Sequence, residues 1–482
     1  MVKSDKMRYN YNRGNPMRMN DIGVIGMAVM GKNLALNFAD QGFKVAIYNR
    51  TTSVSYEVFN ENPQQNLDVH ETLEGFINSL SKPRKLLIMV QAGDPVDKVI
   101  SACIPFLEAG DIIMDGGNSF YKDTQLRYAK LQAQGFHYLG VGVSGGEEGA
   151  RFGPAIMPSG DYKAYLLVQP LLDKIAAVAE GEPCSAYVGN DGSGHFVKMV
   201  HNGIEYGDMQ LIAETFSILS HGFNTPIPTI QSIFEQWNKG DLESYLIEIT
   251  SQILKVKDTY SDHFLVEMVE DVAHQKGTGK WTASASLEMN TDSSVLTSAV
   301  FARFMSEMKE KRLHAARLFE KQKNHESLTT EWESKLEKAL YVAKLMSYAQ
   351  GFELLTQANQ LYAWNLKFNT IAKGWRAGCI IRAQFLNKIA NAYELNDSLS
   401  HLLFDPFFES LVKLHIQDLR DVVVLAASKG IAMPTFMNAL AYFDGITTAY
   451  SSANLIQAQR DFFGAHTFKR TDREGTYHDE WK

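Results

Sequence analysis

Hydrophobic positions in the first part of the chain fall in short runs, each about the length of one buried strand. These runs lie at residues 22–25, 44–48, 86–90, 111–114 and 138–143. Between them, apolar residues recur at helical spacing, for example over residues 30–41 and 94–107. This alternation of strand and helix predicts a parallel, doubly wound sheet of the Rossmann type.

The second part of the chain changes to long segments with helical periodicity. These segments lie at residues 197–222, 242–257, 331–360 and 410–429. A helical region of this size commonly buries its helices in a bundle or in a subunit interface. We therefore expect an α/β Rossmann-type domain at residues 21–192, followed by a large all-α domain at residues 193–450. A basic extension at residues 1–20 precedes these domains, and a C-terminal tail at residues 451–482 follows them.

The tail is unusual because it combines few aliphatic residues with several aromatic ones. Its aromatic residues are Phe462, Phe463, Phe468, Tyr477 and Trp481. Disordered tails usually lack aromatic residues. We infer that the tail docks, either on its own body or on a partner subunit, with Arg460 and His466 as its candidate functional groups.

Composition limits the class of protein. The 482 residues are 45% hydrophobic and 21% charged, as in ordinary globular proteins, and no run of 18 apolar residues predicts a membrane span. The net charge of −8 disfavours a nucleic-acid binder, although a local cationic pocket for an anionic small molecule remains open. Cys103, Cys184 and Cys379 are too scattered for a disulfide framework or a zinc site, which indicates a cytoplasmic protein.

The basic extension carries five Lys or Arg residues against Asp5 and has no apolar core, so we do not expect a secretory signal. An organelle transit peptide is an alternative, but that class is usually rich in serine and this stretch has only Ser4. We interpret residues 1–20 as a disordered extension and assign them no function.

The turn after the first predicted strand matches a dinucleotide-binding fingerprint. Gly26, Ala28 and Gly31 hold the three positions of a G-x-A-x-x-G variant. Small residues there let the backbone approach a pyrophosphate, whose charge is met by free N–H groups at the start of a helix. The motif follows a strand and opens a helix, which is the context that it requires.

The second predicted strand ends in Asn49, Arg50 and Thr51, where NAD-binding folds place an acid for the ribose 2′-hydroxyl. A guanidinium and polar groups suit the 2′-phosphate of NADP instead. The alternative is an exposed turn arginine.

Three polar loops that contain glycine follow later strands, at residues 90–93, 115–119 and 144–149. Ligands bind at this edge of such sheets. The N–H groups of Gly145 and Gly146, with the Ser144 hydroxyl, suit a carboxylate.

A helix predicted at residues 192–210 carries a polar face on an otherwise apolar surface. Its polar residues are spaced i, i+3, i+4 and i+7 and are Lys198, His201, Asn202 and Glu205. If this face lies in a cleft, burial moves the pKa values of the lysine and the glutamate toward neutrality. The alternative is a solvated polar stripe without chemistry.

Two further stretches suit phosphate binding. Residues 276–282 form a cationic, glycine-rich loop whose spacing differs from a P-loop, and residues 299–303 place an arginine after an apolar run. Alone, each is more often a solvated loop or a cation that caps a helix.

Taken together, the chain resembles the 6-phosphogluconate dehydrogenase family, within the β-hydroxyacid dehydrogenase superfamily. The resemblance runs from Asp21 to Trp481 and rests on an ordered set of motifs: GMAVMGKN, YNRT, MDGGNS, VSGGEEGA, HFVKMVHNGIEYGDMQ, QKGTGKWT, AVFAR, WRAGCIIRA and QAQRDFFGAHTF. It implies oxidative decarboxylation of 6-phospho-D-gluconate to D-ribulose 5-phosphate and CO2 with reduction of NADP, in the pentose phosphate pathway and gluconate utilisation, without a metal.

The resemblance also implies a role for each matching residue. Lys198 is the general base and Glu205 the general acid. The substrate-binding residues are Ser144, Gly145, Gly146, His201, Asn202, Tyr206, Lys276, Thr278 and Arg303, joined by Arg460 and His466 from the tail of the other subunit of a homodimer. The cofactor-binding residues are Gly26, Met27, Ala28, Val29, Met30, Gly31, Asn49, Arg50, Thr51, Val90, Gln91, Ala92 and Asn118.

The implied chemistry requires a neutral lysine, so burial or a nearby cation such as Lys276 must lower a reference pKa of about 10.4. Glu205 needs a raised pKa to protonate an enediol. Two departures from the family pattern are Ser159, where we expect glycine, and Gln91, where lysine is frequent. Two alternatives are a relative that oxidises another 3-hydroxy acid and a catalytically silent NADP-binding scaffold.

Overall fold

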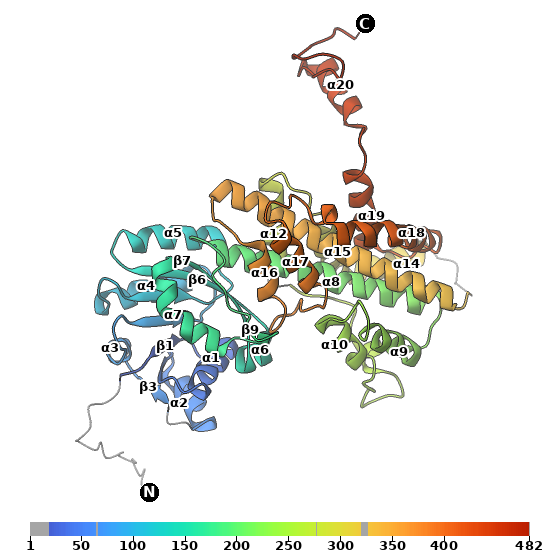
Figure 1. The fold of residues 1–482 in the computed structure, drawn as a ribbon. Helices are drawn as coiled ribbons and strands as arrows, with labels where there is room; N and C mark the ends of the chain where they lie inside the picture. Colours follow the sequence, from blue (N-terminus) through green and yellow to red (C-terminus); the bar gives the residue numbers. More distant parts are fainter. Residues whose placement is uncertain (1–18, 64–65, 276, 320–325, 482) are drawn as a thin grey trace, which may run out of the picture.

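The computed structural model describes residues 19–63, 66–275, 277–319 and 326–481, and Figure 1 shows two lobes with a projecting C-terminal tail. The first lobe is built on a sheet and the second is helical, as the sequence predicts. Lys276 and most of the predicted basic extension, residues 1–18, lie outside the described residues.

The sheet of the first lobe has seven strands in the order β3-β2-β1-β4-β5-β6-β7. The first six strands are parallel: β1 (Ile22–Ile25), β2 (Val45–Tyr48), β3 (Leu67–Val69), β4 (Lys85–Ile88), β5 (Ile112–Asp115) and β6 (His137–Ser144). The order reverses between β1 and β4, which makes the carboxyl end of β1 the topological switch point. The predicted doubly wound arrangement is confirmed.

The last strand, β7 (Ala155–Gly160), was not predicted from the sequence, and it pairs antiparallel with β6. Residues 145–154 separate the two strands, and most of them form the short helix α6 (Gly146–Phe152). A parallel return needs a crossover of a dozen or more residues that packs across the sheet. The connection is too short for that, so the chain turns back beside β6.

Helices cover both faces of the sheet. One core joins the strands to α1 (Val29–Asp40) and α7 (Tyr162–Ile175), and a second core joins them to helices on the other face. The other helices of this lobe are α2 (Thr52–Glu61), α3 (Leu73–Asn78), α4 (Asp94–Cys103), the 3-10 turn Ile104–Phe106 and α5 (Tyr121–Gln132), and a small two-stranded sheet pairs β8 (Val178–Ala179) with β9 (Glu182–Pro183).

The helical lobe is centred on two long, buried helices that pack against each other, α8 (Ser193–Ser217) and α15 (Thr330–Tyr362). Helix α8 also contacts β6 and β7, so it joins the lobes. No helix in the described part of the chain is long and apolar enough to cross a membrane. The remaining helices are a π turn at Ile218–Gly222, α9 (Ile227–Trp237), α10 (Tyr245–Ile253), α11 (Leu265–Met268), α12 (Thr278–Glu288), α13 (Ser294–Glu307), α14 (Lys309–Leu318), α16 (Phe368–Gly374), α17 (Leu386–Leu395), a 3-10 turn at Leu402–Phe404, α18 (Pro406–Ser428) and α19 (Pro434–Ile446).

The tail leaves the body after α19 and carries one more helix, α20 (Ala453–Gly464), well away from both lobes (Figure 1). It is organised around Asp461, whose buried carboxylate accepts hydrogen bonds from the Thr467 and Asp479 N–H groups and from the Trp481 indole. Phe468 and Tyr477 pair as a short antiparallel bridge. The tail is therefore ordered in itself, without docking on its own body.

Candidate active site

The polar face of α8 lies in a cavity of about 530 Å³ between the two lobes. Lys198, Asn202 and Glu205 line this cavity, while His201 lies behind them and is fully buried. Ser144, Gly145 and Gly146 reach the same cavity from the end of β6 and the start of α6. The structure thus excludes a solvated polar stripe and brings the predicted groups of both lobes together.

Two glycines explain how α8 can carry polar groups and still pack tightly. A Cβ at Gly203 would lie 2.6 Å from the Thr282 side chain on α12, and one at Gly207 would lie 2.7 Å from Ser347 Oγ on α15. Glycine at these positions costs helix propensity. In return, α12 and α15 approach α8 closely at these two positions. Their packing fixes the turn of α8 between Gly203 and Gly207, which carries Glu205.

A short hydrogen-bonded chain connects the groups of the two lobes. His201 Nε2 lies 3.2 Å from Ser144 Oγ, and His201 Nδ1 lies 3.4 Å from Lys198 Nζ and 3.2 Å from Asn202 Oδ1. Burial, and then the charge of Lys198, hold the pKa of His201 well below its usual value. A neutral imidazole therefore sits between Ser144 and the lysine.

The lysine and the glutamate of α8 have pKa values that move toward each other. Burial lowers the pKa of Lys198 and raises that of Glu205, and the attraction between the two groups opposes both shifts. A lysine with a lowered pKa can be neutral and accept a proton, and a carboxyl group with a raised pKa can keep one. The cavity thus holds a candidate base and a candidate acid two turns apart on one helix.

The far end of the cavity is cationic. The Arg303 guanidinium lies 3.5 Å from the centre of the Tyr206 ring, and burial lowers the pKa of this arginine. Thr278 begins α12 after Gly277, so the first N–H groups of that helix open here. A helix start beside an arginine suits a phosphate. Lys276, predicted for the same role, lies outside the described residues.

The predicted cofactor residues gather at the switch point of the sheet. A Cβ at Gly31 would lie 1.9 Å from the Gly26 carbonyl oxygen, so only glycine allows this close approach of α1 to β1. Helix α1 begins without a side-chain cap at Ala28, and the Met27 N–H donates to Asn49 Oδ1 at 3.2 Å. Pyrophosphate binding at uncapped N–H groups fits this geometry.

The remaining cofactor predictions also lie at this edge of the sheet. Arg50 and Thr51 are exposed after β2, while Met30 and Asn118 line the same cavity as Lys198. Residues 90–92, which follow β4, are half-buried or exposed. Ser159, where the family pattern has glycine, is fully buried, and its hydroxyl donates to the Gly140 and Asp191 carbonyls.

Two predicted site residues do not reach the cavity within one chain. Arg460 is exposed on α20, where it donates to Gln457 Oε1 at 2.9 Å, and His466 packs beside the ring of Phe463. Figure 1 shows α20 projecting away from both lobes.

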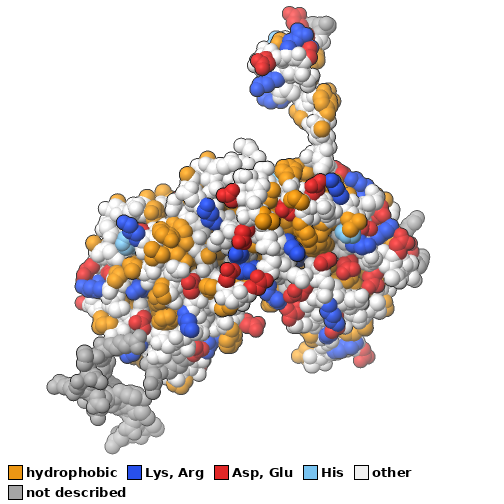
Figure 2. Space-filling view, in the orientation of Figure 1, with side chains coloured by type: hydrophobic (Ala, Val, Ile, Leu, Met, Phe, Trp, Pro, Cys, Tyr) orange, Lys and Arg blue, Asp and Glu red, His pale blue; other side chains and the backbone are white. Residues whose placement is uncertain are grey.

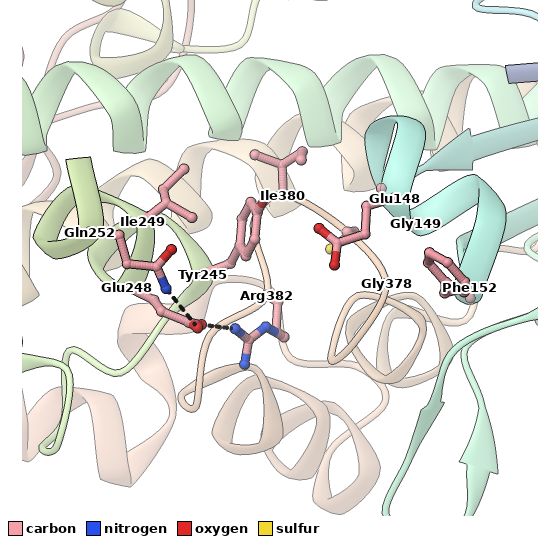
Figure 3. A pocket seen from close by; sticks show the side chains of 13 residues that line it. Glu148, Gly149, Phe152, Tyr245, Glu248, Ile249, Gln252, Gly378, Ile380 and Arg382 are labelled. Carbon is pink, nitrogen blue, oxygen red and sulfur yellow. Dashed lines mark hydrogen bonds and ion pairs between the residues drawn. The ribbon is translucent and has the colours of Figure 1, made fainter. Parts of the chain in front are cut away.

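Sequence reasoning missed several residues that line the cavity: Val143, Met209, His274, Gln275 and Ile380. Ile380 belongs to the motif WRAGCIIRA, which contributes to the family resemblance but to which the sequence analysis assigns no role in the site. It also borders a second cavity of about 500 Å³, drawn in Figure 3, where Arg382 forms an ion pair with Glu248 and Glu148 points into the space. Gly145 and Ile380 are common to both cavities.

Comparisons with known proteins cover nearly the whole chain. A family model described as the NAD binding domain of 6-phosphogluconate dehydrogenase matches residues 21–189, and one described as 6-phosphogluconate dehydrogenase, C-terminal domain, matches residues 194–481. The decarboxylating 6-phosphogluconate dehydrogenase of Salmonella typhimurium is 50% identical over 96% of this chain and 100% of its own length. The NADP(+)-dependent decarboxylating enzyme of Bacillus subtilis is 49% identical over the same shares of the two chains.

A solved structure gives the same result. The 6-phosphogluconate dehydrogenase of Plasmodium falciparum, studied in its apo form and in complex with NADP+ and with 6-phosphogluconate, superimposes with a TM-score of 0.93. It is 43% identical, and the match covers 96% of this chain and 100% of that one.

Proposed function

The chain belongs to the 6-phosphogluconate dehydrogenase family, and on this premise we propose which of its groups perform each step of the reaction. The reaction is the oxidative decarboxylation of 6-phospho-D-gluconate to D-ribulose 5-phosphate and CO2, with reduction of NADP. The observation that carries the proposal is that the buried Lys198 and the partly buried Glu205 line one cavity from one face of α8, with a lowered and a raised pKa.

The substrate lies with its carboxylate at Ser144, Gly145 and Gly146 and its phosphate at the cationic end of the cavity. Tyr206, Thr278 and Arg303 line that end, and the family resemblance assigns the same role to Lys276, which lies outside the described residues. This orientation places the sugar hydroxyls along Lys198, His201 and Asn202. A cavity of about 530 Å³ has room for such a molecule.

The switch-point edge of the sheet binds NADP, which supplies the hydride acceptor when bound. The close approach of Gly26 and Gly31 leaves the backbone N–H groups of α1 open to the pyrophosphate. Asn49, Arg50 and Thr51 meet the 2′-phosphate, because no acidic residue stands at the end of β2 to repel it. Residues 90–92 and Asn118 complete the site.

Lys198 begins the reaction by taking the proton of the C3 hydroxyl as the hydride leaves C3. Its burial lowers its pKa, which favours the neutral form that this step requires. The product is a β-keto acid, and the protonated lysine then returns its proton to the ketone oxygen as the C1 carboxylate leaves as CO2. His201 and Asn202 keep the hydroxyl and the lysine aligned.

Glu205 completes the reaction by protonating the enediol carbon that becomes C1 of ribulose 5-phosphate, while the neutral Lys198 takes the proton of the C2 hydroxyl so that the C2 ketone forms. Its raised pKa lets it hold this proton until the enediol forms. After this step the protonated lysine gives up its proton and the ionised glutamate takes one up, through solvent, so that both groups return to their starting states. Each titratable group thus acts in the protonation state that its burial favours.

The tail completes the phosphate site of a second subunit in a homodimer. Arg460 and His466 are exposed at the end of an ordered tail that reaches away from its own cavity. The apolar side chains Tyr450, Leu455, Ile456, Phe462 and Phe463 are exposed along the same tail, as Figure 2 illustrates. Exposed apolar surface of this kind marks an interface. The homodimer acts in the cytoplasm, in the pentose phosphate pathway, in keeping with three buried, free cysteines.

Formation of NADPH, followed by absorbance, tests the reaction directly. We expect signal with 6-phosphogluconate and NADP, trapped CO2 equal to the NADPH formed, and little signal with NAD or gluconate. Comparable turnover of gluconate would favour a relative that oxidises another 3-hydroxy acid. NADP binding without turnover would identify a silent scaffold.

A further inference from the structure

A buried ion pair lies directly beneath the proposed acid. Lys344 Nζ of α15 lies 2.8 Å from Asp208 Oδ2 of α8, and each side chain is only 1% exposed. Burying two charges costs free energy, and packed apolar residues of similar volume often do as well. The reaction steps above do not use this pair, so its presence calls for an explanation.

The pair connects α8, which carries Glu205, to α15 and, through Tyr348, to the loop at Ile381. Asp208 stands three residues after Glu205, so it lies one turn further along the same side of α8. Tyr348, one turn after Lys344, lies 3.5 Å from Asp208 Oδ2 and donates a hydrogen bond of 2.9 Å to the Ile381 carbonyl. The neighbouring Ile380 lines the catalytic cavity, and Arg382 is held on its other side by Glu248 (Figure 3).

The charges around Glu205 give Asp208 a second effect. Lys198 on the same helix and Arg303 on α13 both favour the ionised form of Glu205, and His201 is neutral. Thr278 of α12 carries no charge, Lys344 and Tyr348 of α15 face Asp208, and Lys276 is outside the described residues. Asp208 is the described group whose negative charge favours the protonated form of Glu205.

The groups around the Asp208 carboxylate determine how far it carries this negative charge. Its Oδ2 faces Lys344, while its Oδ1 is buried and has no hydrogen-bond partner among the described residues. Burial raises the pKa of Asp208, and the charge and hydrogen bond of Lys344 oppose this rise. The charge of Lys344 therefore favours the ionised form of Asp208, and an ionised Asp208 repels a negative charge on Glu205.

We propose that Asp208 is a positioning residue for the last step of the reaction: with Lys344 and Tyr348 it fixes the turn of α8 that carries Glu205 and keeps the proton on Glu205 until the enediol is ready. The inference rests on the proposed role of Glu205. Asp208 touches neither substrate nor cofactor in this proposal and acts through its neighbour.

Hydrogen exchange at C1 of ribulose 5-phosphate isolates this step from hydride transfer. In D2O without CO2, the enzyme with ribulose 5-phosphate and NADPH can only remove the C1 proton and return a deuteron. Ionised Glu205 removes that proton, so the exchange rate, measured by NMR, rises with pH through the pKa of Glu205. We expect Asp208→Asn to move the midpoint of this profile to lower pH by at least about half a unit.

Matched variants separate this effect from simple loss of packing. Glu214→Gln makes the same change, an acid to its amide, at another buried carboxylate of α8 that is nine residues from Glu205, and it should leave the midpoint unchanged. Lys344→Arg keeps the charge and should keep the wild-type midpoint. Lys344→Met should shift the midpoint as Asp208→Asn does, because an unpaired buried Asp208 takes up a proton.

The double variant Asp208→Asn/Lys344→Met removes both charges. It can be measured in place of the single variants if those do not fold. Its midpoint should match that of Asp208→Asn. A wild-type midpoint in a folded Asp208→Asn or double variant overturns the inference. If Glu205→Gln still exchanges the C1 hydrogen at the wild-type rate, the proposed role of Glu205 fails first, and the role of Asp208 fails with it.

Discussion

The buried helix α8 and the exposed tail both carry residues that the family resemblance assigns to the substrate, but they hold them in opposite ways. Helix α8 fixes Lys198 and Glu205 in a cavity by packing against helices and strands of both lobes. The tail holds Arg460 and His466 on an ordered unit, and neither residue lines the cavity that contains Lys198. We propose that the first region is complete within a single chain and that the second functions on a partner subunit.

The internal order of the tail strengthens this contrast. Although burial alone would raise it, hydrogen bonds from His478, Asp479 and Trp481 hold the pKa of Asp461 well below its usual range. A tail that orders itself before docking loses less conformational entropy on binding. We therefore interpret it as a preformed arm for a partner subunit.

The largest expected effect comes from the buried region. Lys198→Met removes the proposed base, so NADPH formation should fall by about 10³-fold or more. The NADP dissociation constant, measured by calorimetry, should change little. Lys413→Met, which alters an exposed lysine of α18, is the matched control and should keep wild-type turnover. Unchanged turnover in Lys198→Met would contradict the catalytic assignment.

Removing the tail should have the next largest effect. We expect truncation before Gln457 to abolish turnover, because each cavity loses Arg460 and His466. Full activity of the truncated chain would show that the tail is dispensable, and the comparison of α8 with a functional tail would no longer hold.

Mixed dimers decide which cavity the tail serves. When a Lys198→Met chain with an intact tail is combined with an intact body that lacks its tail, tail exchange creates one complete cavity in each heterodimer. Activity should therefore reappear on mixing two inactive chains, up to about half of the wild-type value per dimer at saturation, since one of two cavities is complete. Heterodimers without activity would place each tail on its own body.

The fold was predictable where the chain is regular. Continuous apolar runs predicted the buried parallel strands, because such strands are covered on both faces. The three-residue β3 is too short to give a pattern, and β7 contains Pro158 and Ser159, which break an apolar run. The antiparallel direction of β7 depends on the length of the connection from β6, and no local sequence pattern predicts it.

The site was predictable where its residues share one element. The spacing of Lys198 and Glu205 is visible within three turns of α8. Ile380 and Gln275 come from loops far along the chain, so no local pattern places them in the cavity. Asp208 and Lys344 are separated by 136 residues, and their pairing exists only after α8 and α15 pack together.

A smaller effect should come from the phosphate end, where both regions are expected to meet. Arg303→Met and Arg460→Met should each raise the KM for 6-phosphogluconate by about 10- to 100-fold, because each removes a charge-assisted contact. Their slow turnover of gluconate, which has no phosphate, should stay at the wild-type level. An equal loss with both substrates in one variant would exclude that arginine from phosphate recognition.

The smallest expected effect concerns stability and separates the two regions by pH. Glu214 of α8 accepts hydrogen bonds from the Thr435 and Phe436 N–H groups at the start of α19, the helix that leads to the tail. Burial raises its pKa from 4.5 to about 7, with those hydrogen bonds opposing the rise. Because the folded-state pKa is the higher one, this group stabilises the fold fully below about pH 4.5 and loses that contribution as the pH rises through 7.

We therefore expect the midpoint of thermal unfolding of the wild type to fall between pH 5 and pH 8, with a contribution from Glu214 of up to about 3 kcal/mol. Glu214→Gln keeps an acceptor for the α19 N–H groups and should show a smaller fall, by a few degrees, in differential scanning calorimetry. Asp461→Asn should leave the fall unchanged, because Asp461 is already ionised throughout this pH range. If Asp461→Asn reduced the fall as much as Glu214→Gln does, the tail and α8 would share one pH-dependent unit, and the division between a self-contained helix and an independent arm would be wrong.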